Sequence, residues 1–282
     1  MPGPRELLIG KLSRIQSFGE KTLFFVDEPS RPRAASADAT GGAPDATDIE
    51  VGAPDTAGEV GAPDAADAEV DRRWRELEAR VSVCTLCRLC ETRTHAVFGS
   101  GTRHTRLFIL GEGPGEQEDR QAEAFVGPAG QLLTKILKSV GFERDQVFIT
   151  NIVKCRPPRN RAPLPDEATA CAPYLRAQLE MVDPVVILTL GASATHSLLG
   201  IAIPISKLRG RVHLHQGIPV IPTYHPAALL RNPEYKRPTW EDVQLLRRVY
   251  DEGLARRAAV PSSAAGSKPP EPAAAPQLEL GA

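Results

Sequence analysis

The sequence predicts an α/β fold, a three-layer α/β/α sandwich around a mostly parallel sheet of four strands. Four short apolar runs rich in Val, Ile and Leu are bounded by Gly, Pro or charged residues, as is typical of buried parallel strands. Segments with helical spacing separate these runs, and such alternation of strands and helices indicates this architecture. The expected strands are residues 107–110, 147–152, 185–190 and 220–224.

Helices are expected before the first strand, between the strands and after the last one. In the first helix Trp74, Leu77 and Val81 recur at helical spacing. Pro at a helix start and Gly just past a helix end bound other segments. In the last helix Thr239 and Asp242 have the spacing of a capping box. The expected helices span residues 72–83, 128–140, 166–182, 192–199 and 239–257.

Charge is distributed unevenly along the chain. The formal net charge is −1 over 282 residues, but residues 34–71 contain ten Asp and Glu and no Lys or Arg. A Gly-Ala-Pro-Asp unit recurs there at residues 42–45, 52–55 and 61–64. A segment of this composition buries too little apolar surface to fold, so a disordered linker is expected. The tail over residues 258–282, rich in Ala, Pro and Ser, is expected to be disordered as well.

The predicted folded domain, residues 72–257, is basic, with 27 Lys and Arg against 19 Asp and Glu. A basic domain is typical of a protein that binds a polyanion, although an ordinary solvated surface explains the charge equally well. No apolar run is long enough to span a bilayer, and the N-terminus lacks the apolar core of a signal peptide. A cytoplasmic protein is therefore expected.

The chain contains five cysteines, which are Cys84, Cys87, Cys90, Cys155 and Cys171. In a reducing compartment they argue against a disulfide framework and favour a metal centre. Four thiolates bind either zinc or an iron-sulfur cluster, and spacing alone does not separate the two. Spacing also leaves open which four of the five bind. Isolated buried thiols are the alternative.

Polar and glycine-rich segments follow three of the expected strands. The stretch Gly111-Glu-Gly-Pro-Gly-Glu-Gln-Glu-Asp119 follows the first strand, Asn151 ends the second, and His225 follows the last. Glycine permits close approach of the backbone to a ligand. Because ligands bind at the carboxyl ends of parallel strands, these segments predict a single site.

These motifs resemble those of one known family. The stretch 111–119, Phe125-Val-Gly127, the stretch Asn151-Ile-Val-Lys-Cys-Arg-Pro-Pro158 and His225-Pro226 are similar to the family 4 uracil-DNA glycosylases. The resemblance covers residues 72–254 and implies a uracil-DNA glycosylase-like fold. It further implies a hydrolase that cleaves the N-glycosidic bond of uracil in DNA, leaving an abasic site in base excision repair. The implied cofactor is one 4Fe-4S cluster with ligands Cys84, Cys87, Cys155 and Cys171, so that Cys90 lies outside the set.

The resemblance also implies roles for the site residues. Phe125 would stack on the flipped uracil ring, unless it is an ordinary core aromatic. Asn151 would accept from uracil N3–H and donate to O4, a pattern that cytosine reverses. His225 would donate to O2 as negative charge develops there. The expected uracil-binding residues are Gly113, Phe125, Asn151 and His225.

Activation of water stays open at this point. The better-known uracil glycosylases have an aspartate and a tyrosine in the opening turn, where this chain has Gly113 and Gly115. Glu118 and Glu112 are candidates for guiding water or stabilising the cationic sugar. Glu118 is equally suited to crowding the C5 position of the base, which would exclude thymine. With His225, these two glutamates are the candidate catalytic residues.

The segment after His225 is similar to the intercalation loop of the superfamily. Leu229 is therefore the candidate wedge that fills the vacated stack, with Arg231 near the DNA backbone, unless Leu229 and Leu230 are core anchors. Basic side chains near the site are candidates for phosphate contacts. They are Lys154, Arg156, Arg159, Arg161, Lys207, Arg209 and Arg211.

The expected partner is uracil-containing DNA, bound by a monomer. One alternative is a uracil-DNA binder of the same fold that is either non-catalytic or covalently trapping. The other is a zinc-stapled nucleotide-binding module without catalysis. Covalently trapping relatives carry an inserted loop with a histidine, whereas residues 156–165 contain none. The role of residues 1–33 is unknown. Within them Glu20-Lys-Thr-Leu-Phe24 loosely resembles peptides that dock on bacterial sliding clamps.

Overall fold

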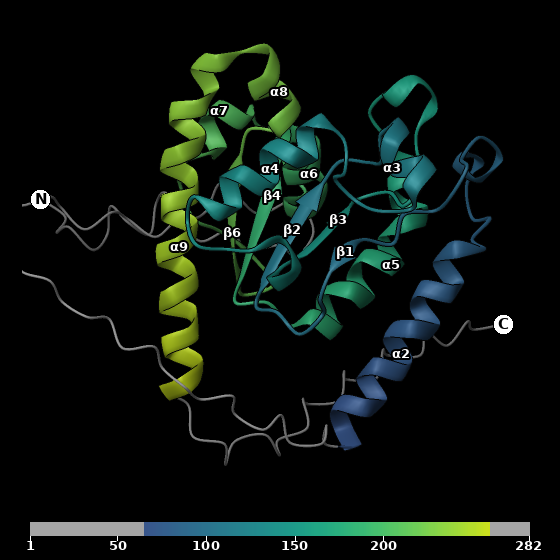
Figure 1. Cartoon of the computed structure of the whole chain (residues 1–282), viewed down its shortest axis with the longest axis horizontal. Coiled ribbons are helices and arrows are strands. Elements are labelled where there is room, and N and C mark those ends of the chain that lie inside the picture. Colours follow the sequence, from purple (N-terminus) through teal and green to yellow (C-terminus); the bar gives the residue numbers. More distant parts are fainter. Residues whose placement is uncertain (1–64, 260–282) are drawn as a thin grey trace, which may run out of the picture.

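The structure, a computed structural model, describes residues 65–259. A six-stranded sheet lies at its centre, with strand order β1-β3-β2-β4-β6-β5 (Figure 1). The four inner strands are parallel and correspond to the four predicted ones. They are β3 (Phe148–Asn151), β2 (Leu107–Gly111), β4 (Val186–Leu190) and β6 (Ile218–Thr223).

The sheet has six strands, whereas four were predicted, and it is mixed because two antiparallel strands lie at its edges. They are β1 (Ser100–Gly101), which pairs with β3, and β5 (His213–His215), which pairs with β6. Both were missed from the sequence, since two or three residues are too few to show an alternating pattern.

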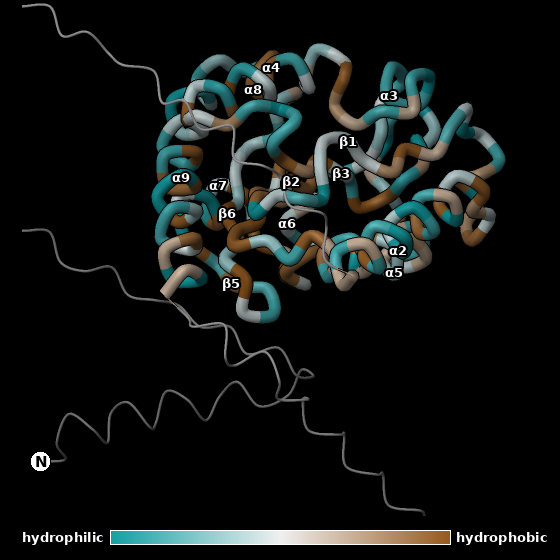
Figure 2. Tube along the Cα trace, turned by 60° about the horizontal axis from the view of Figure 1, so that its bottom comes forward, coloured by the Kyte–Doolittle hydropathy of each residue, from teal (hydrophilic) through white to brown (hydrophobic). Residues whose placement is uncertain are grey.

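The two faces of the sheet are covered by different helices, as the three-layer prediction requires. On one face Phe108 and Leu110 of β2 pack in a core with residues of α2, α5 and α6. On the other face Leu107 and Ile109 pack with residues of α4 and α9. Figure 2 shows hydrophobic segments concentrated in the interior around the strands, with hydrophilic segments over the outer sides of the helices.

Five helices agree with the sequence prediction to within a few residues at most ends. These helices are α2 (Ala65–Ser82), α4 (Pro128–Lys138), α5 (Pro165–Val182), α6 (Gly191–Leu199) and α9 (Lys236–Ala259). Three short helices were not predicted. They are α3 (Glu116–Gln121), α7 (Ile205–Leu208) and α8 (Pro226–Arg231). Residues 65–259 also contain four 3-10 turns: η1 (Arg88–Glu91), η2 (Arg144–Gln146), η3 (Pro158–Asn160) and η4 (Pro233–Tyr235).

The start of α2 corrects the predicted boundary of the linker. Residues 65–71 were expected to be disordered, but they form the first turns of α2. Buried Arg103 donates to Asp67 Oδ1 at 3.0 Å and also pairs with Asp71. These two acidic residues therefore belong to the folded domain, because they neutralise a buried guanidinium.

The start of α9 corrects the predicted capping box. The helix begins at Lys236, so Thr239 lies inside it. The carboxylate of Asp242 accepts from Thr223 Oγ1 at 2.7 Å and from Arg209, and it thereby ties α9 to β6. The spacing of the two residues matched a cap, but Asp242 serves tertiary contacts, and Thr239 Oγ1 is buried without a hydrogen-bond partner among the described residues.

The remaining predictions for the termini fall outside the described residues. These are the repeats, the segment resembling a clamp-binding peptide and the tail from residue 260 onward. Among the described helices, none combines the length and apolar character that crossing a membrane requires.

Candidate active site

A pocket of about 600 Å³ opens at the carboxyl edge of the parallel strands. Its wall contains residues from all three segments that were expected to converge. The predicted residues that line it are Glu112, Gly113, Glu118, Phe125, Asn151, Arg161, His225 and Arg231. The convergence follows from the parallel register of β2, β3, β4 and β6, which brings their carboxyl ends to one edge.

A fourth wall segment, Leu190 to Ser193, was missed from the sequence. It is the junction of β4 and α6, where Gly191 adopts a φ of +88°. A Cβ at this glycine would lie 3.0 Å from His225 Cβ. The signal was present, since Gly191 directly follows a predicted strand and precedes a predicted helix.

Phe125 lies in the pocket wall in an unusual backbone conformation. Its φ of 56° is rare for a bulky residue, and its ring lies 5.7 Å from the His225 ring at an angle of 33°. A Cβ at Gly130 would come within 1.7 Å of the Phe125 carbonyl oxygen. The glycine therefore permits the tight turn that directs the phenyl ring into the pocket wall.

Asn151 ends β3 and is 2% exposed. Its Oδ1 is buried and has no hydrogen-bond partner among residues 65–259. A buried polar atom left unpaired costs on the order of 1–3 kcal/mol, so a ligand that pairs with it binds more favourably. The orphaned oxygen is thus the candidate recognition point of the pocket.

Gly111 lies beside Asn151 on the neighbouring strand. A Cβ at this position would lie 2.4 Å from Asn151 Oδ1 and 2.5 Å from Phe125 Cζ. Glycine is therefore required for both side chains to occupy the same end of the sheet. At Gly113 a Cβ would likewise lie 3.0 Å from Val153 Cγ2, so the opening turn packs closely on the segment after β3.

His225 is the N-cap residue of α8, and its Nδ1 accepts the N–H of Ala227 at 3.2 Å. In the neutral imidazole the proton therefore resides on Nε2. Burial and, to a smaller extent, the charge of Arg231 lower the pKa of His225 to about 4, against an opposing effect of Glu118. The side chain is accordingly a neutral hydrogen-bond donor at physiological pH.

The carboxylate of Glu118 anchors the turn that holds Phe125. Its Oε1 accepts from the backbone N–H groups of Val126 at 3.0 Å and Gly127 at 2.9 Å. The side chain therefore joins α3 to the start of α4. Glu112 also lines the pocket, and its carboxylate makes no hydrogen bond or ion pair within the part of the chain that the structure describes.

Lys154 corrects a prediction, because it is 1% exposed and cannot reach DNA phosphate. Its Nζ donates to Thr150 Oγ1 at 2.6 Å, to the Asn151 carbonyl oxygen at 2.8 Å and to Gln178 Oε1 at 2.6 Å. Burial lowers the pKa of this ammonium to about 8. Lys154 therefore holds the backbone in place at Asn151.

Arg209 is a second correction among the predicted phosphate contacts. Its side chain is 15% exposed, and its guanidinium forks onto Asp242 with two contacts of 2.9 Å. A third contact reaches Glu241 at 3.3 Å. Because these carboxylates already neutralise it, Arg209 is a tertiary link rather than a free cation. Lys207 and Arg211 are exposed, and their contact with DNA stays a prediction.

The predicted wedge is also corrected. Both leucines belong to α8, but Leu229 is 2% exposed, whereas Leu230 is 52% exposed. The sequence identified the pair but not the face of the short helix on which each lies. Buried Leu229 agrees with the stated alternative, a core anchor, and insertion of the exposed Leu230 into a DNA stack stays a prediction.

The segment after β3 presents three arginines with different partners. Arg156 donates to Asn160 Oδ1 at 2.8 Å and lies 3.4 Å from Glu116. Arg161 pairs with Glu167 at 2.6 Å. Arg159 is exposed, has a left-handed φ of 57°, and forms no ion pair within residues 65–259. It is therefore the cation of this segment that is most available to DNA.

Four cysteines line one small pocket between the end of α2 and α5, namely Cys84, Cys87, Cys155 and Cys171. Cys90 is not among the lining residues. All are free thiols. Burial raises the pKa of Cys155 to about 11 and also raises the pKa values of Cys87 and Cys171. The predicted ligand set is thus brought together from three separate segments.

The surroundings of these thiols suit a metal cluster. Arg93 Nη1 donates to Cys155 Sγ at 2.9 Å, and the Lys154 backbone N–H donates to Cys171 Sγ at 3.3 Å. Hydrogen bonds to sulfur are a recurring feature of iron-sulfur sites. Within residues 65–259, no group of three or more His, Cys, Asp or Glu side chains is arranged to hold a single metal ion. The four thiols line one small pocket, and thiolates are the ligands of iron-sulfur clusters.

Comparison with known proteins agrees with the geometry. The sequence profile of the Uracil DNA glycosylase superfamily matches residues 98–244. A type-4 uracil-DNA glycosylase from Thermotoga maritima is 47% identical over 169 residues, covering 58% of this chain and 88% of that protein. A type-4 uracil-DNA glycosylase from Sulfurisphaera tokodaii is 44% identical, with 62% and 83% covered. A type-5 uracil-DNA glycosylase from Pyrobaculum aerophilum is 32% identical, with 55% and 65% covered. The chain therefore belongs to the uracil-DNA glycosylase superfamily, and within it to the type-4 uracil-DNA glycosylases.

Proposed function

We propose that this protein flips uracil out of DNA into the pocket and hydrolyses its N-glycosidic bond, leaving an abasic site for base excision repair. The observation that carries the proposal is the unpartnered amide oxygen of Asn151, which lies beside Phe125 and His225 in a pocket at the strand ends. A base inside a duplex is out of reach of these groups, so the nucleotide must be extruded.

Recognition uses the edge and the face of the base. Asn151 accepts from uracil N3–H and donates to O4, so cytosine, with the reversed pattern, leaves the buried amide mismatched. Phe125 offers an aromatic surface for stacking, which contributes on the order of 1–3 kcal/mol per base. Gly113 lets the opening turn approach the base closely.

Bond cleavage leaves negative charge on the departing uracil and positive charge on the sugar. Neutral His225 holds its proton on Nε2 and donates it in a hydrogen bond to O2 as charge builds there. A donor fixed in this way needs no reorganisation during the reaction. The attacking water adds its oxygen to C1′ of the sugar as the C1′–N1 bond breaks, and the proton that it loses neutralises the uracil anion.

Glu112 is the candidate that guides this water. Its carboxylate lines the pocket and is free of partners in the described chain, whereas Glu118 is committed to two backbone N–H groups. We assign Glu118 to anchoring the Phe125 turn. A role for it in crowding the C5 position of the base remains compatible with its place in the pocket wall.

The cysteines are proposed to hold one 4Fe-4S cluster through Cys84, Cys87, Cys155 and Cys171. When bound, the cluster would supply iron-thiolate bonds. These bonds would cross-link residues 84–90, the cysteine segment, to the segment after β3 and to α5. The buried thiols must lose their protons to the metal, because thiolates are the ligands. Absorbance at about 400 nm distinguishes an iron-sulfur cluster from colourless zinc thiolates.

The function is tested with an oligonucleotide that carries a single uracil. After incubation with the protein, treatment with alkali should break the strand at the uracil, while a thymine oligonucleotide stays intact. An intact uracil strand would contradict the proposal. An adduct that survives denaturing electrophoresis would instead favour the covalently trapping binder. Binding to a sliding clamp and the monomeric state stay predictions.

A further inference from the structure

Glu167 is a fully buried carboxylate in the first turn of α5, 0% exposed. Arg161 donates to it from two nitrogens, at 2.8 Å to Oε2 and at 2.6 Å to Oε1. The backbone N–H of Leu164 donates to Oε2 at 2.8 Å. The hydrogen bond from Arg161 lowers the pKa of this carboxyl, and the group is therefore ionised.

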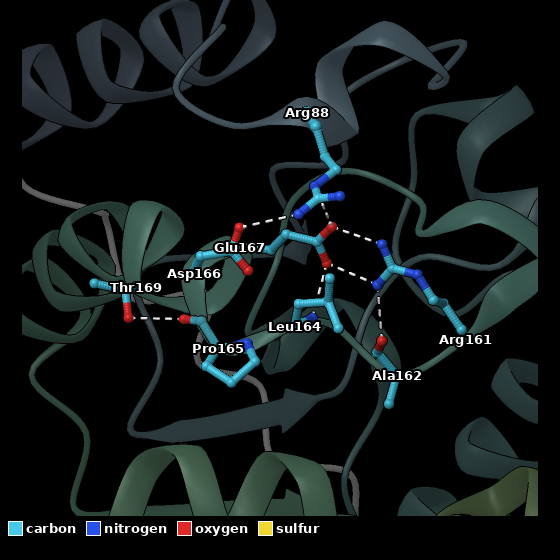
Figure 3. A network of polar contacts seen from close by, with 8 residues as sticks. All are labelled: Arg88, Arg161, Ala162, Leu164, Pro165, Asp166, Glu167 and Thr169. Carbon is cyan, nitrogen blue, oxygen red and sulfur yellow. Dashed lines mark hydrogen bonds and ion pairs between the residues drawn. The ribbon is translucent and has the colours of Figure 1, made fainter.

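A second arginine approaches the same carboxylate from the cysteine segment. Arg88 Nε lies 3.7 Å from Glu167 Oε1, and Arg88 Nη2 lies 3.4 Å from Asp166 Oδ2 (Figure 3). Arg88 opens η1, which directly follows Cys87. Figure 3 shows Glu167 between the two arginines, one from each segment.

The other arginine belongs to the pocket. Arg161 lines the pocket wall and also donates to the Ala162 carbonyl oxygen at 2.9 Å. It ends the turn in which Arg159 and Asn160 both have left-handed φ values, 57° and 56°. Two successive non-glycine residues in this conformation carry strain, so the turn needs firm anchors at its ends.

We infer that Glu167 is a positioning residue that ties the cysteine segment to the wall of the pocket through Arg88 and Arg161. The inference rests on the proposed function, because the wall that Glu167 holds is the one that receives DNA. The contact with Arg88 is exposed and adds little stability, whereas the partly buried, two-point fork with Arg161 is the stronger interaction. The arrangement acts through geometry, because one carboxylate holds the cysteine segment and the pocket wall in place relative to each other.

The test compares Glu167→Gln with Asp242→Asn. Asp242 is also 0% exposed and is also forked by one arginine, Arg209, but neither residue of this pair lines the pocket. Both variants should lose thermal stability. Only Glu167→Gln should raise KM for uracil-containing DNA, by about tenfold with kcat little changed, as expected when positioning for binding is lost. Only this variant should be cut faster by trypsin after Arg159 and Arg161.

Arg88→Met provides a second variant in case Glu167→Gln fails to fold, since the Arg88 side chain is 60% exposed. The cysteine segment should then release iron to a chelator several-fold faster than wild type, while Asp242→Asn releases it at the wild-type rate. The inference is overturned if KM and trypsin cleavage of Glu167→Gln match those of Asp242→Asn, or if Arg88→Met releases iron no faster than wild type. Should the wild-type protein leave uracil-DNA intact, the proposed function fails, and trypsin cleavage and iron release still decide the tie.

Discussion

The neighbours of Asn151 determine where it lies and leave its amide oxygen unpaired. Gly111 leaves space for it, Lys154 binds its carbonyl oxygen at 2.8 Å, and its Oδ1 faces no protein partner among the described residues. The residue is thus held firmly at the backbone and left unsatisfied at the side chain. That combination suits a group that discriminates between bases, because the backbone is held in place while the amide oxygen stays available to the base.

Asn151→Asp should therefore weaken uracil excision. A carboxylate cannot donate to O4, and the loss of one buried hydrogen bond, about 1–3 kcal/mol, lowers kcat/KM by about ten- to hundredfold. Single-turnover kinetics on a uracil oligonucleotide measures the effect. Asn232→Asp is the control, because Asn232 is outside the residues that line the pocket. Unchanged uracil kinetics in Asn151→Asp would remove this residue from the site.

His225 predicts the acid limb of the pH profile. Its pKa of about 4 is lowered by burial and then by Arg231, so the neutral form persists until the pH falls toward that value. Protonation would give Ala227 a donor at Nδ1 where it needs an acceptor, and activity should fall. Arg231→Met removes the positive charge, so the pKa of His225 should rise and the acid limb should shift to higher pH.

The matched control for this profile is Arg231→Lys, which keeps the charge and should keep the wild-type limb. The measurement is the single-turnover rate at saturating DNA across the acid range. Identical limbs in the Met and Lys variants would show that His225 does not govern the acid side.

At the scale of elements, the long strands and helices were predictable and the short ones were not. Strands β2, β3 and β4 were predictable as apolar runs because both faces of each are buried, and the same holds for the last four residues of β6. The helices α3 and α8 have six residues each, too few for a helical period to stand out. Both carry site residues, so the shape of the site was the least predictable part.

The short helix α8 leads to a prediction about DNA insertion. Leu230 is 52% exposed, so Leu230→Ala should lower excision from duplex DNA more than from single strands, with little change in thermal stability. Leu229 is 2% exposed, so Leu229→Ala should destabilise the fold by about 2–5 kcal/mol, as for other buried leucines. Parallel duplex and single-strand assays, with melting curves for both variants, separate the two roles. If Leu229→Ala alone impairs duplex excision at full stability, the original wedge assignment stands.

At the scale of the whole molecule, charge could be counted from the sequence but not assigned to a surface. Residues 72–257 contain more Lys and Arg than Asp and Glu. Two of these cations, Lys154 and Arg209, have partners within the fold and do not present a free charge to solvent. A basic residue in a loop gives no sign of which carboxylates will pack against it. The motif located the pocket, and only the packing shows which cations face outward.

Arg159 tests the outward-facing charge. Replacing it by Gln should weaken DNA binding and reduce the slope of log Kd against log salt by about 1, as one phosphate contact is lost. Arg256→Gln is the control, because Arg256 is 63% exposed in the last turn of α9, at the end of that helix away from α8 (Figure 1). Equal slopes for the Arg159 variant and wild type would place the phosphate contact elsewhere.

Loss of the proposed cluster should act on one part of the molecule before the rest. The cysteine segment directly follows α2, which packs on the domain through Leu77, Val81 and Trp74. The Trp74 ring lies 5.0 Å from Phe98 and 4.9 Å from Phe148. The parallel sheet has its own core on the other face, built on α4 and α9. Chelation of iron should therefore expose Trp74 and shift its fluorescence to longer wavelength, while circular dichroism retains the signal of the sheet. Trp240→Phe makes Trp74 the single reporter, since the chain has 2 Trp. A fluorescence maximum that stays constant as the absorbance at about 400 nm disappears would show that α2 is held by packing alone.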